Sequence, residues 1–197
     1  MSEGNINTGR RRFLTAATSV VGAAGAVGIA VPFVGSWQPS AKAKAAGAPV
    51  KIDVSKVQPG EMIVVEWRGK PVYVVHRTQD QLDTLAQLND QVADPDSERP
   101  QQPTYAQNIE RAINPKYLIV VGLCTHLGCA PKHRPEVAPA DLGPDWLGGF
   151  YCPCHGSTFD ISGRVYKSKP APSNLEVPPH RFETDAVIVI GEDQEVA

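Results

Sequence analysis

Apolar residues follow two different patterns along the chain, and the first predicts a membrane segment. From Phe13 to Val34, apolar and small residues run for 22 positions without a charge. At about 1.5 Å per residue a helix of that length spans roughly 33 Å, enough to cross the hydrocarbon core of a bilayer. We therefore predict a single transmembrane helix over 13–37, with the aromatic Trp37 at one membrane interface.

The second pattern appears after residue 50. Short runs rich in Val, Ile and aromatic residues are bounded by Gly, Pro or Asp, which is typical of strands. The predicted strands are Lys51–Val57, Met62–Trp67, Pro71–Arg77, Tyr117–Leu123 and Ala186–Ile190. Within 79–90, Leu82, Leu85 and Leu88 recur at helical spacing and predict one short helix packed by one face. The fold class that follows is all-β, a small antiparallel domain with one inserted helix.

Two segments show neither of these apolar patterns. Residues 38–50 combine small residues, lysines and two prolines, and are interpreted as a linker. Residues 91–115 are polar and proline-rich, and are interpreted as a surface excursion. The expected organisation is therefore a tail over 1–12, the helix, the linker, and a domain over 51–197.

Charge and composition restrict the class of protein. The 197 residues carry a net charge of −2, which suits one modest domain with an appendage. No basic patch suggests nucleic-acid binding, because the tight basic run is Arg10–Arg12 alone. That run precedes Phe13-Leu14, and R-R-x-F-L resembles a twin-arginine export signal. Twin-arginine export moves folded proteins, so a cofactor can be inserted before translocation.

The apolar segment can be a removed signal or a retained anchor. Cleaved signals have an apolar region of about 7–15 residues, shorter than this one, although Ala41-Lys-Ala43 resembles a small-residue cleavage site. We expect retention. The export motif then places the N-terminus in the cytoplasm and the domain in the periplasm, on the bacterial inner membrane.

All four cysteines lie in two short boxes, each with a histidine. The boxes are Cys124-Thr-His126-Leu-Gly-Cys129 and Cys152-Pro-Cys154-His155-Gly-Ser157. The residues alone allow a zinc site, a pair of disulfides, or an iron–sulfur cluster ligated by Cys and His. Zinc held by two thiolates and two imidazoles would leave Cys129 and Cys154 unexplained.

The two boxes resemble those of the Rieske iron–sulfur proteins of bacterial quinol–cytochrome c oxidoreductases, the cytochrome bc complexes. This resemblance implies one Rieske-type 2Fe–2S cluster, with two Cys ligands on one iron and two His ligands on the other. It also implies a disulfide between Cys129 and Cys154. The implied metal ligands are Cys124, His126, Cys152 and His155.

The resemblance assigns supporting roles to other residues of a cluster-binding part that covers about 121–173. They are Ser157, a hydrogen-bond donor to a bridging sulfide; Leu127, a shield over the exposed histidine face; and Pro170 and Pro172, in a loop that covers the cluster. Two positions depart from the family. Lys169 stands where a glycine is common, and Phe159 replaces a frequent tyrosine whose hydroxyl donates to a cluster cysteine.

Histidine ligation changes the charge of such a cluster. Two thiolates and two neutral imidazoles leave the oxidised form near neutral, whereas four thiolates leave it negative, so the reduction potential rises. Reduction makes the cluster negative, and the imidazoles then hold their protons more tightly. Electron uptake and proton uptake are therefore coupled, as oxidation of a hydroquinone requires.

The implied function is that of the electron-transfer subunit of a ubiquinol–cytochrome c reductase. Ubiquinol in a cytochrome b subunit would hydrogen-bond to His155, our first choice as catalytic proton acceptor, or to His126. The electron would pass to a c-type cytochrome of the same complex, which is expected to be dimeric. The alternative is a small Rieske subunit of an arsenite-oxidase-like periplasmic enzyme.

Overall fold

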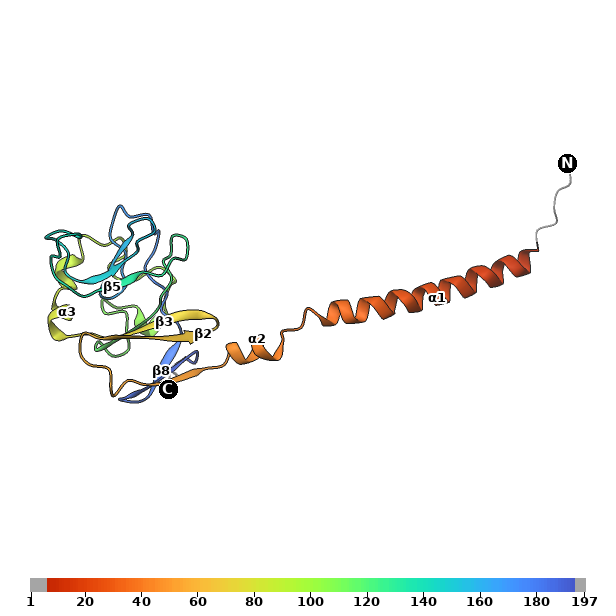
Figure 1. Cartoon of the computed structure of the whole chain (residues 1–197), viewed down its shortest axis with the longest axis horizontal. Coiled ribbons are helices and arrows are strands. Elements are labelled where there is room, and N and C mark those ends of the chain that lie inside the picture. Colours follow the sequence, from red (N-terminus) through yellow and green to blue (C-terminus); the bar gives the residue numbers. More distant parts are fainter. Residues whose placement is uncertain (1–6, 194–197) are drawn as a thin grey trace. The chain divides into compact units, whose positions relative to one another are not determined.

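The computed structural model describes residues 7–193 and separates two compact units, Met1–Ala45 and Ala46–Ala197. In the first unit, helix α1 spans Thr8–Gly35, the long helix next to the N-terminus in Figure 1. It begins before the predicted apolar segment because Asn7 accepts a hydrogen bond from the Arg10 amide and caps it. The remaining residues of the predicted tail, 1–6, lie outside the described residues.

Helix α1 has the length and composition of a membrane span. The helix is 28 residues long, its most apolar 18-residue window has a mean hydropathy of 1.8, and none of its side chains is buried within the protein. Pro32 lies near its end, where Ser36 and Trp37 close the last turn. The segment predicted as a linker also contains a short helix, α2 (Ala41–Ala46), started by Ser40, whose hydroxyl accepts from the Ala43 amide.

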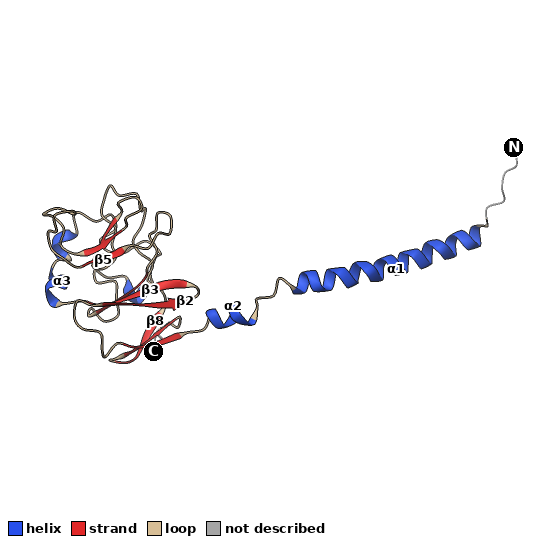
Figure 2. Ribbon diagram, viewed as in Figure 1, coloured by secondary structure: helices blue, strands red, loops and turns tan. Residues whose placement is uncertain are grey.

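The second unit is built from three antiparallel sheets of three strands each, drawn in red in Figure 2. The first has the order β1 (Val50–Asp53), β9 (Val187–Ile190), β8 (His180–Thr184). The second has the order β2 (Met62–Trp67), β3 (Lys70–His76), β4 (Tyr117–Val121). The third has the order β5 (Lys132–Arg134), β6 (Gly149–Tyr151), β7 (Thr158–Asp160). The all-β prediction is confirmed.

The sheet β2–β3–β4 lies between two hydrophobic cores. Along β3, Val72 and Val74 face the core shared with the β1–β9–β8 sheet, while Tyr73 and Val75 face the core under the cysteine boxes. All five residues of β4 are buried. A strand buried on both faces reads as a continuous apolar run, which is why Tyr117–Val121 does not alternate.

The predicted helix is shorter than its leucine spacing suggested. Helix α3 covers Gln79–Asp83 and begins at a capping box in which Thr78 and Gln81 exchange hydrogen bonds. A 3₁₀ turn, Ala86–Leu88, continues it, and a second 3₁₀ turn covers Thr104–Ala106. Leu85 and Leu88 are buried as predicted.

Residues 91–115 were wrongly interpreted as a purely surface excursion. Arg111 is fully buried and donates to the carbonyls of Ser162 and Leu175. Burial lowers the pKa of Arg111 to about 10. The excursion is thus fastened into the domain by a charged side chain, a contact between distant segments that no local pattern reveals.

Asp160 and Arg164 look in the sequence like turn and rim residues at the surface, and the structure corrects this. Both side chains are fully buried and form a salt bridge of 2.6 Å. The Asp160 carboxylate also accepts from the amides of Ser162 and Arg164, and so closes the turn that follows β7. A buried ion pair needs such additional hydrogen bonds to offset the loss of hydration.

Candidate metal centre

The first cysteine box forms a closed loop directly after β4. The Cys124 amide donates to the Cys129 carbonyl at 2.7 Å, and the Gly128 amide donates to the Cys124 carbonyl at 2.8 Å. Gly128 has a φ of 78°, in the left-handed region that favours glycine. The loop therefore requires its glycine at the fifth position of the box.

The second box repeats this conformation after β6. The Cys152 amide donates to the Ser157 carbonyl at 2.8 Å, and the Gly156 amide donates to the Cys152 carbonyl at 3.0 Å. Gly156 has a φ of 73°. Each loop is thus six residues long, closed by the same two backbone bonds, with its first cysteine at the end of a sheet.

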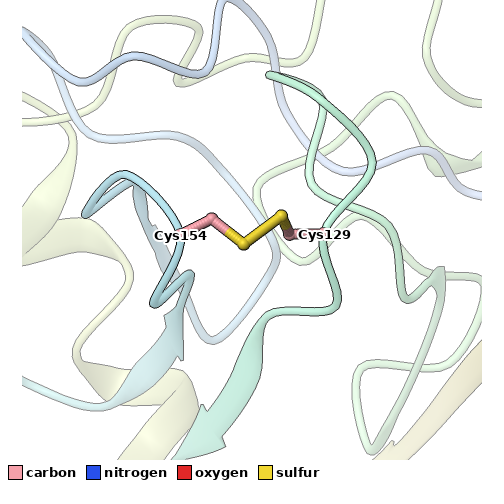
Figure 3. Close-up of a disulfide and its surroundings, with 2 residues drawn as sticks. All are labelled: Cys129 and Cys154. Carbon is pink, nitrogen blue, oxygen red and sulfur yellow. A yellow bond between two sulfur atoms is a disulfide. The ribbon is translucent and has the colours of Figure 1, made fainter.

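A disulfide between Cys129 and Cys154 joins the two loops, with their Cα atoms 6.6 Å apart (Figure 3). The predicted pairing is confirmed. Cys124 and Cys152 are unbonded and buried, with exposed fractions of 3% and 2%. Two of the four cysteines therefore link the loops, and the other two keep free, buried thiols.

The rings of the two histidines in the boxes lie against each other. The ring centroids of His126 and His155 are 4.7 Å apart, and the rings are nearly perpendicular. His126 Nδ1 is buried and has no hydrogen-bond partner among residues 7–193. His155 is exposed, whereas His126 is half-buried. A buried ring nitrogen without a partner is costly unless something binds it.

The donor set fits a metal cluster. Burial raises the pKa of the Cys124 thiol, and the neighbouring Cys152 thiol raises it further. Two thiolates held this close in a buried place require compensating positive charge, which iron supplies. Two sulfurs and two ring nitrogens from twin loops match the mixed Cys and His ligation of a Rieske-type centre.

Hydrogen bonds pin the proline loop to both boxes. The Ala171 amide donates to Ser157 Oγ at 3.0 Å, and Thr125 Oγ1 donates to the Ser173 carbonyl at 2.6 Å. Ser157 is 1% exposed, and its hydroxyl can donate to the Cys124 sulfur, where it lowers the pKa of that thiol. The sequence analysis did not predict that Thr125 fastens the proline loop, although its place between Cys124 and His126 in the first box indicated a role there.

The substitution at Lys169 leaves the proline loop intact. The left-handed residue is Ser168, with a φ of 59°, and Lys169 itself does not adopt a positive φ. Pro170 and Pro172 are exposed on either side of the buried Ala171. Arg99 from the excursion donates to the Pro172 carbonyl at 2.5 Å and braces the loop from outside.

Other residues in and between the boxes differ in exposure. Leu127 is 71% exposed in the first loop. Trp146 and Phe150, in the long segment between the boxes, are buried. Phe159 is fully buried beneath the second box and offers no hydrogen-bond donor there. Of the remaining histidines, His76 bonds to the Val57 carbonyl and His180 to the Pro178 carbonyl, away from the boxes in sequence.

Comparison with known protein families agrees with this arrangement. Residues 49–179 match the family model described as Rieske [2Fe-2S] domain. Residues 1–40 match a model described as Ubiquitinol-cytochrome C reductase Fe-S subunit TAT signal. The two models together cover both units of the chain.

Curated relatives are similar along almost the whole length. The ubiquinol-cytochrome c reductase iron-sulfur subunit of Allochromatium vinosum is 56% identical over 194 residues, covering 98% of this chain and 94% of the relative. The subunit of the same name from Blastochloris viridis is 42% identical, covering 92% of each. A solved chain of a hyperthermophilic respiratory complex III is 27% identical, with a TM-score of 0.49 over 88% of this chain and 98% of that one.

Proposed function

Since the chain belongs to the family of Rieske iron–sulfur subunits of ubiquinol–cytochrome c reductases, we propose that its domain takes electrons from ubiquinol bound in a cytochrome b subunit and passes them to a c-type cytochrome. The chain is an electron-transfer subunit with a Rieske-type 2Fe–2S cluster, and it belongs to respiratory complex III. The arsenite-oxidase-like alternative is not favoured, because the matched relatives bear the reductase name.

We assign Cys124 and Cys152 to one iron of the cluster, and His126 and His155 to the other. The observation that carries this assignment is the convergence of two buried free thiols and two ring nitrogens on loops tied by a disulfide. When bound, the cluster supplies a one-electron acceptor whose potential is raised by its neutral imidazole ligands.

His155 is the residue that would meet the quinol. Its side chain is exposed, whereas that of His126 is half-buried, so its ring is the more accessible hydrogen-bond acceptor. A quinol hydroxyl would donate to the His155 ring nitrogen that is not used as a ligand, and that nitrogen would keep the proton. Leu127, exposed beside the boxes, would give the apolar quinol ring a surface to pack on and exclude water there.

The surroundings hold these ligands in place. Ser157 would direct its hydroxyl proton to sulfur at the cluster while its oxygen accepts from the Ala171 amide. Pro170 and Pro172 restrict the backbone of the covering loop, which Thr125 fastens to the first box. Both ligand loops therefore have a fixed geometry before and after electron transfer.

The proposed location is the bacterial inner membrane. Helix α1 would remain as a single anchor, with the N-terminus in the cytoplasm and the Rieske domain in the periplasm. The length and hydropathy of α1 and the match to an export-signal family support this. Residues 38–50 would act as a hinge that lets the domain reach two redox partners in a dimeric complex.

Metal analysis combined with electron paramagnetic resonance of the reduced, detergent-purified protein tests the assignment. Iron and acid-labile sulfide should be present in equal amounts, with the spectrum of a cluster ligated by both Cys and His. His155→Cys should alter that spectrum, whereas His76→Cys should leave it unchanged. Zinc without iron, or a wild-type spectrum typical of four cysteine ligands, would refute the proposal.

A further inference from the structure

Three sulfur atoms of the two ligand loops lie close together. Those of Cys129, Cys152 and Cys154 all lie within 4.8 Å of one another. Cys129 and Cys154 are joined as the disulfide, so they cannot act as ligands, whereas Cys152 is a free, buried thiol. Cys124 touches Cys152 through its thiol but does not belong to this group of three.

A free thiol beside a disulfide can exchange with it, because attack on one sulfur releases the other. We propose that Cys152 attacks the Cys129–Cys154 disulfide whenever its sulfur is not bound to the cluster. This rests on the ligand role proposed for Cys152. Binding of the cluster would then protect the disulfide as well as carry the electron.

The step balances without an external oxidant. The Cys152 sulfur forms a bond to Cys129 Sγ and gives its proton to solvent, while the bond between Cys129 and Cys154 breaks and the Cys154 sulfur takes up a proton. One disulfide and one thiol are present before and after. The number of oxidised sulfur pairs is unchanged.

Exposure and chain length favour Cys129 as the sulfur attacked. Cys154 is exposed, so the thiol that it becomes on leaving is readily solvated, whereas Cys129 is half-buried. Attack on Cys154 would instead link residues separated by Pro153 alone, in a small, restricted ring. The product expected is therefore a Cys129–Cys152 disulfide with a free Cys154.

The exchange has a consequence for cluster assembly. It removes one of the two thiolates from the proposed ligand set. The first loop is then linked to Cys152 in place of Cys154, two residues earlier in the second loop. A chain that loses its cluster, or receives its disulfide first, could not bind a cluster until the new bond is reduced. Insertion of the cluster before the disulfide forms avoids this, which agrees with an export signal of the kind that carries folded proteins.

Disulfide mapping of the full-length wild-type protein in detergent tests the proposal. Free thiols are alkylated under denaturing conditions, before and after anaerobic removal of the cluster with an iron chelator. Fragment spectra then locate the alkyl group on Cys152 or Cys154. Before removal the bond should be Cys129–Cys154; afterwards a Cys129–Cys152 bond with alkylated Cys154 should appear. Native pairing alone after complete loss of iron would overturn the proposal.

Two serine variants provide a matched pair. Cys124→Ser and Cys152→Ser each remove one proposed thiolate ligand, so both should lack iron, yet only Cys152 is within reach of both disulfide sulfurs. After oxidation in the same glutathione buffer, Cys124→Ser should contain the exchanged bond and Cys152→Ser only the native one. Native pairing in both variants would contradict the exchange.

A third measurement separates the exchange from the ligand assignment. Wild-type protein stripped of its cluster should regain its paramagnetic signal with iron and sulfide only after prior treatment with dithiothreitol. Full recovery without a reductant would count against the exchange. Full iron content in Cys124→Ser, by contrast, would refute the ligand assignment, whatever the disulfide map shows.

Discussion

At the scale of single residues, the backbone of the ligand loops depends on two glycines. Gly128 and Gly156 both occupy the left-handed region, and in neither case would an added Cβ meet another atom within 4 Å. Substitution would therefore cost backbone strain alone. The glycine in each box is required by the turn that returns the chain to its first cysteine, rather than by lack of space.

We expect Gly128→Ala to lower the free energy of unfolding by about 1–2 kcal/mol, because an L-residue is disfavoured at this φ. It should also lower cluster content, since relaxing the strain would move His126. Gly69→Ala is the control, because Gly69 has a similar φ of 71° and open space, but lies in the β2–β3 turn. Thermal denaturation and iron analysis of both variants would show this, and equal iron content would contradict a positional role for Gly128.

Phe159→Tyr tests the missing donor beneath the second box. A hydroxyl there could donate to a cluster sulfur, and a hydrogen bond to a charged group contributes about 1.5–3 kcal/mol in gross terms. The potential depends only on the difference between the oxidised and reduced states, so a smaller rise is expected. Redox titration of the variant would measure it. The control is Phe150→Tyr, because Phe150 on β6 is the cross-strand partner of Phe159 on β7. An unchanged or lower potential would indicate that another group already supplies the donor.

His180 should make stability depend on pH. The side chain is fully buried, and burial lowers its pKa from the ordinary value of 6.5. Below that value the unfolded chain binds a proton that the folded chain rejects, so stability is fully present above pH 6.5 and declines as the pH falls below it. Urea unfolding between pH 7.5 and 5 should show this decline, and His180→Gln should reduce it. An identical pH slope in the variant would exclude His180 as the cause.

At the scale of elements, one ion pair connects two segments that are distant in the chain. Arg164, after β7, bonds to Asp160 and also donates to the Leu85 carbonyl at 2.8 Å and to Asn89 Oδ1 at 2.8 Å. It therefore joins the strand next to the second box to the α3 region. The fully buried Arg111 makes a similar connection between the excursion and Leu175, just after the proline loop.

Arg164→Met should destabilise the domain by about 3–5 kcal/mol, because it leaves the Asp160 carboxylate buried without its partner. The paired variant Arg164→Met with Asp160→Asn should be less destabilised than the sum of the two single variants, since neither charge is then left alone. Chemical denaturation of the four proteins would complete the cycle. Strict additivity would mean that the two side chains contribute independently.

At the scale of the whole molecule, the two units have different environments. Helix α1 exposes apolar side chains along its length, whereas the apolar side chains of the domain are gathered in two cores. An exposed apolar helix of 28 residues is stable in lipid because all its interior backbone groups are bonded within the helix. The domain needs no such environment.

Retention of α1 predicts that the protein purified from membranes requires detergent and begins near Met1 or Ser2. Removal of residues 1–45 should release a water-soluble domain with unchanged iron content, because each unit is compact by itself. N-terminal sequencing and fractionation would check this. A membrane-purified protein that begins near Lys44 or Ala46 would show that the segment is a cleaved signal.

The sequence by itself determined the features that depend on local spacing. The uncharged run from Phe13 predicted α1, and the Val- and Ile-rich run Met62–Trp67 predicted β2 with its observed bounds. The two boxes indicated a site for metal or disulfides, and their resemblance to the Rieske family implied the cluster type and the Cys129–Cys154 bond. These signals are local because each can be read from a few consecutive residues. The leucine spacing located the helical region in the same way, although α3 itself ends at Asp83.

Only the tertiary structure decided which polar side chains lie inside. Strands β5–β7 have three residues each, too few for a periodic pattern, and exist because they pair with one another. The burial of Arg111 depends on the Leu175 carbonyl, and that of Arg164 on the Leu85 carbonyl and Asn89 Oδ1, all distant in the chain. The same holds for the bond from Thr125 to Ser173. A polar residue in a sequence reads as exposed, and only its folded partners offset the cost of burying it.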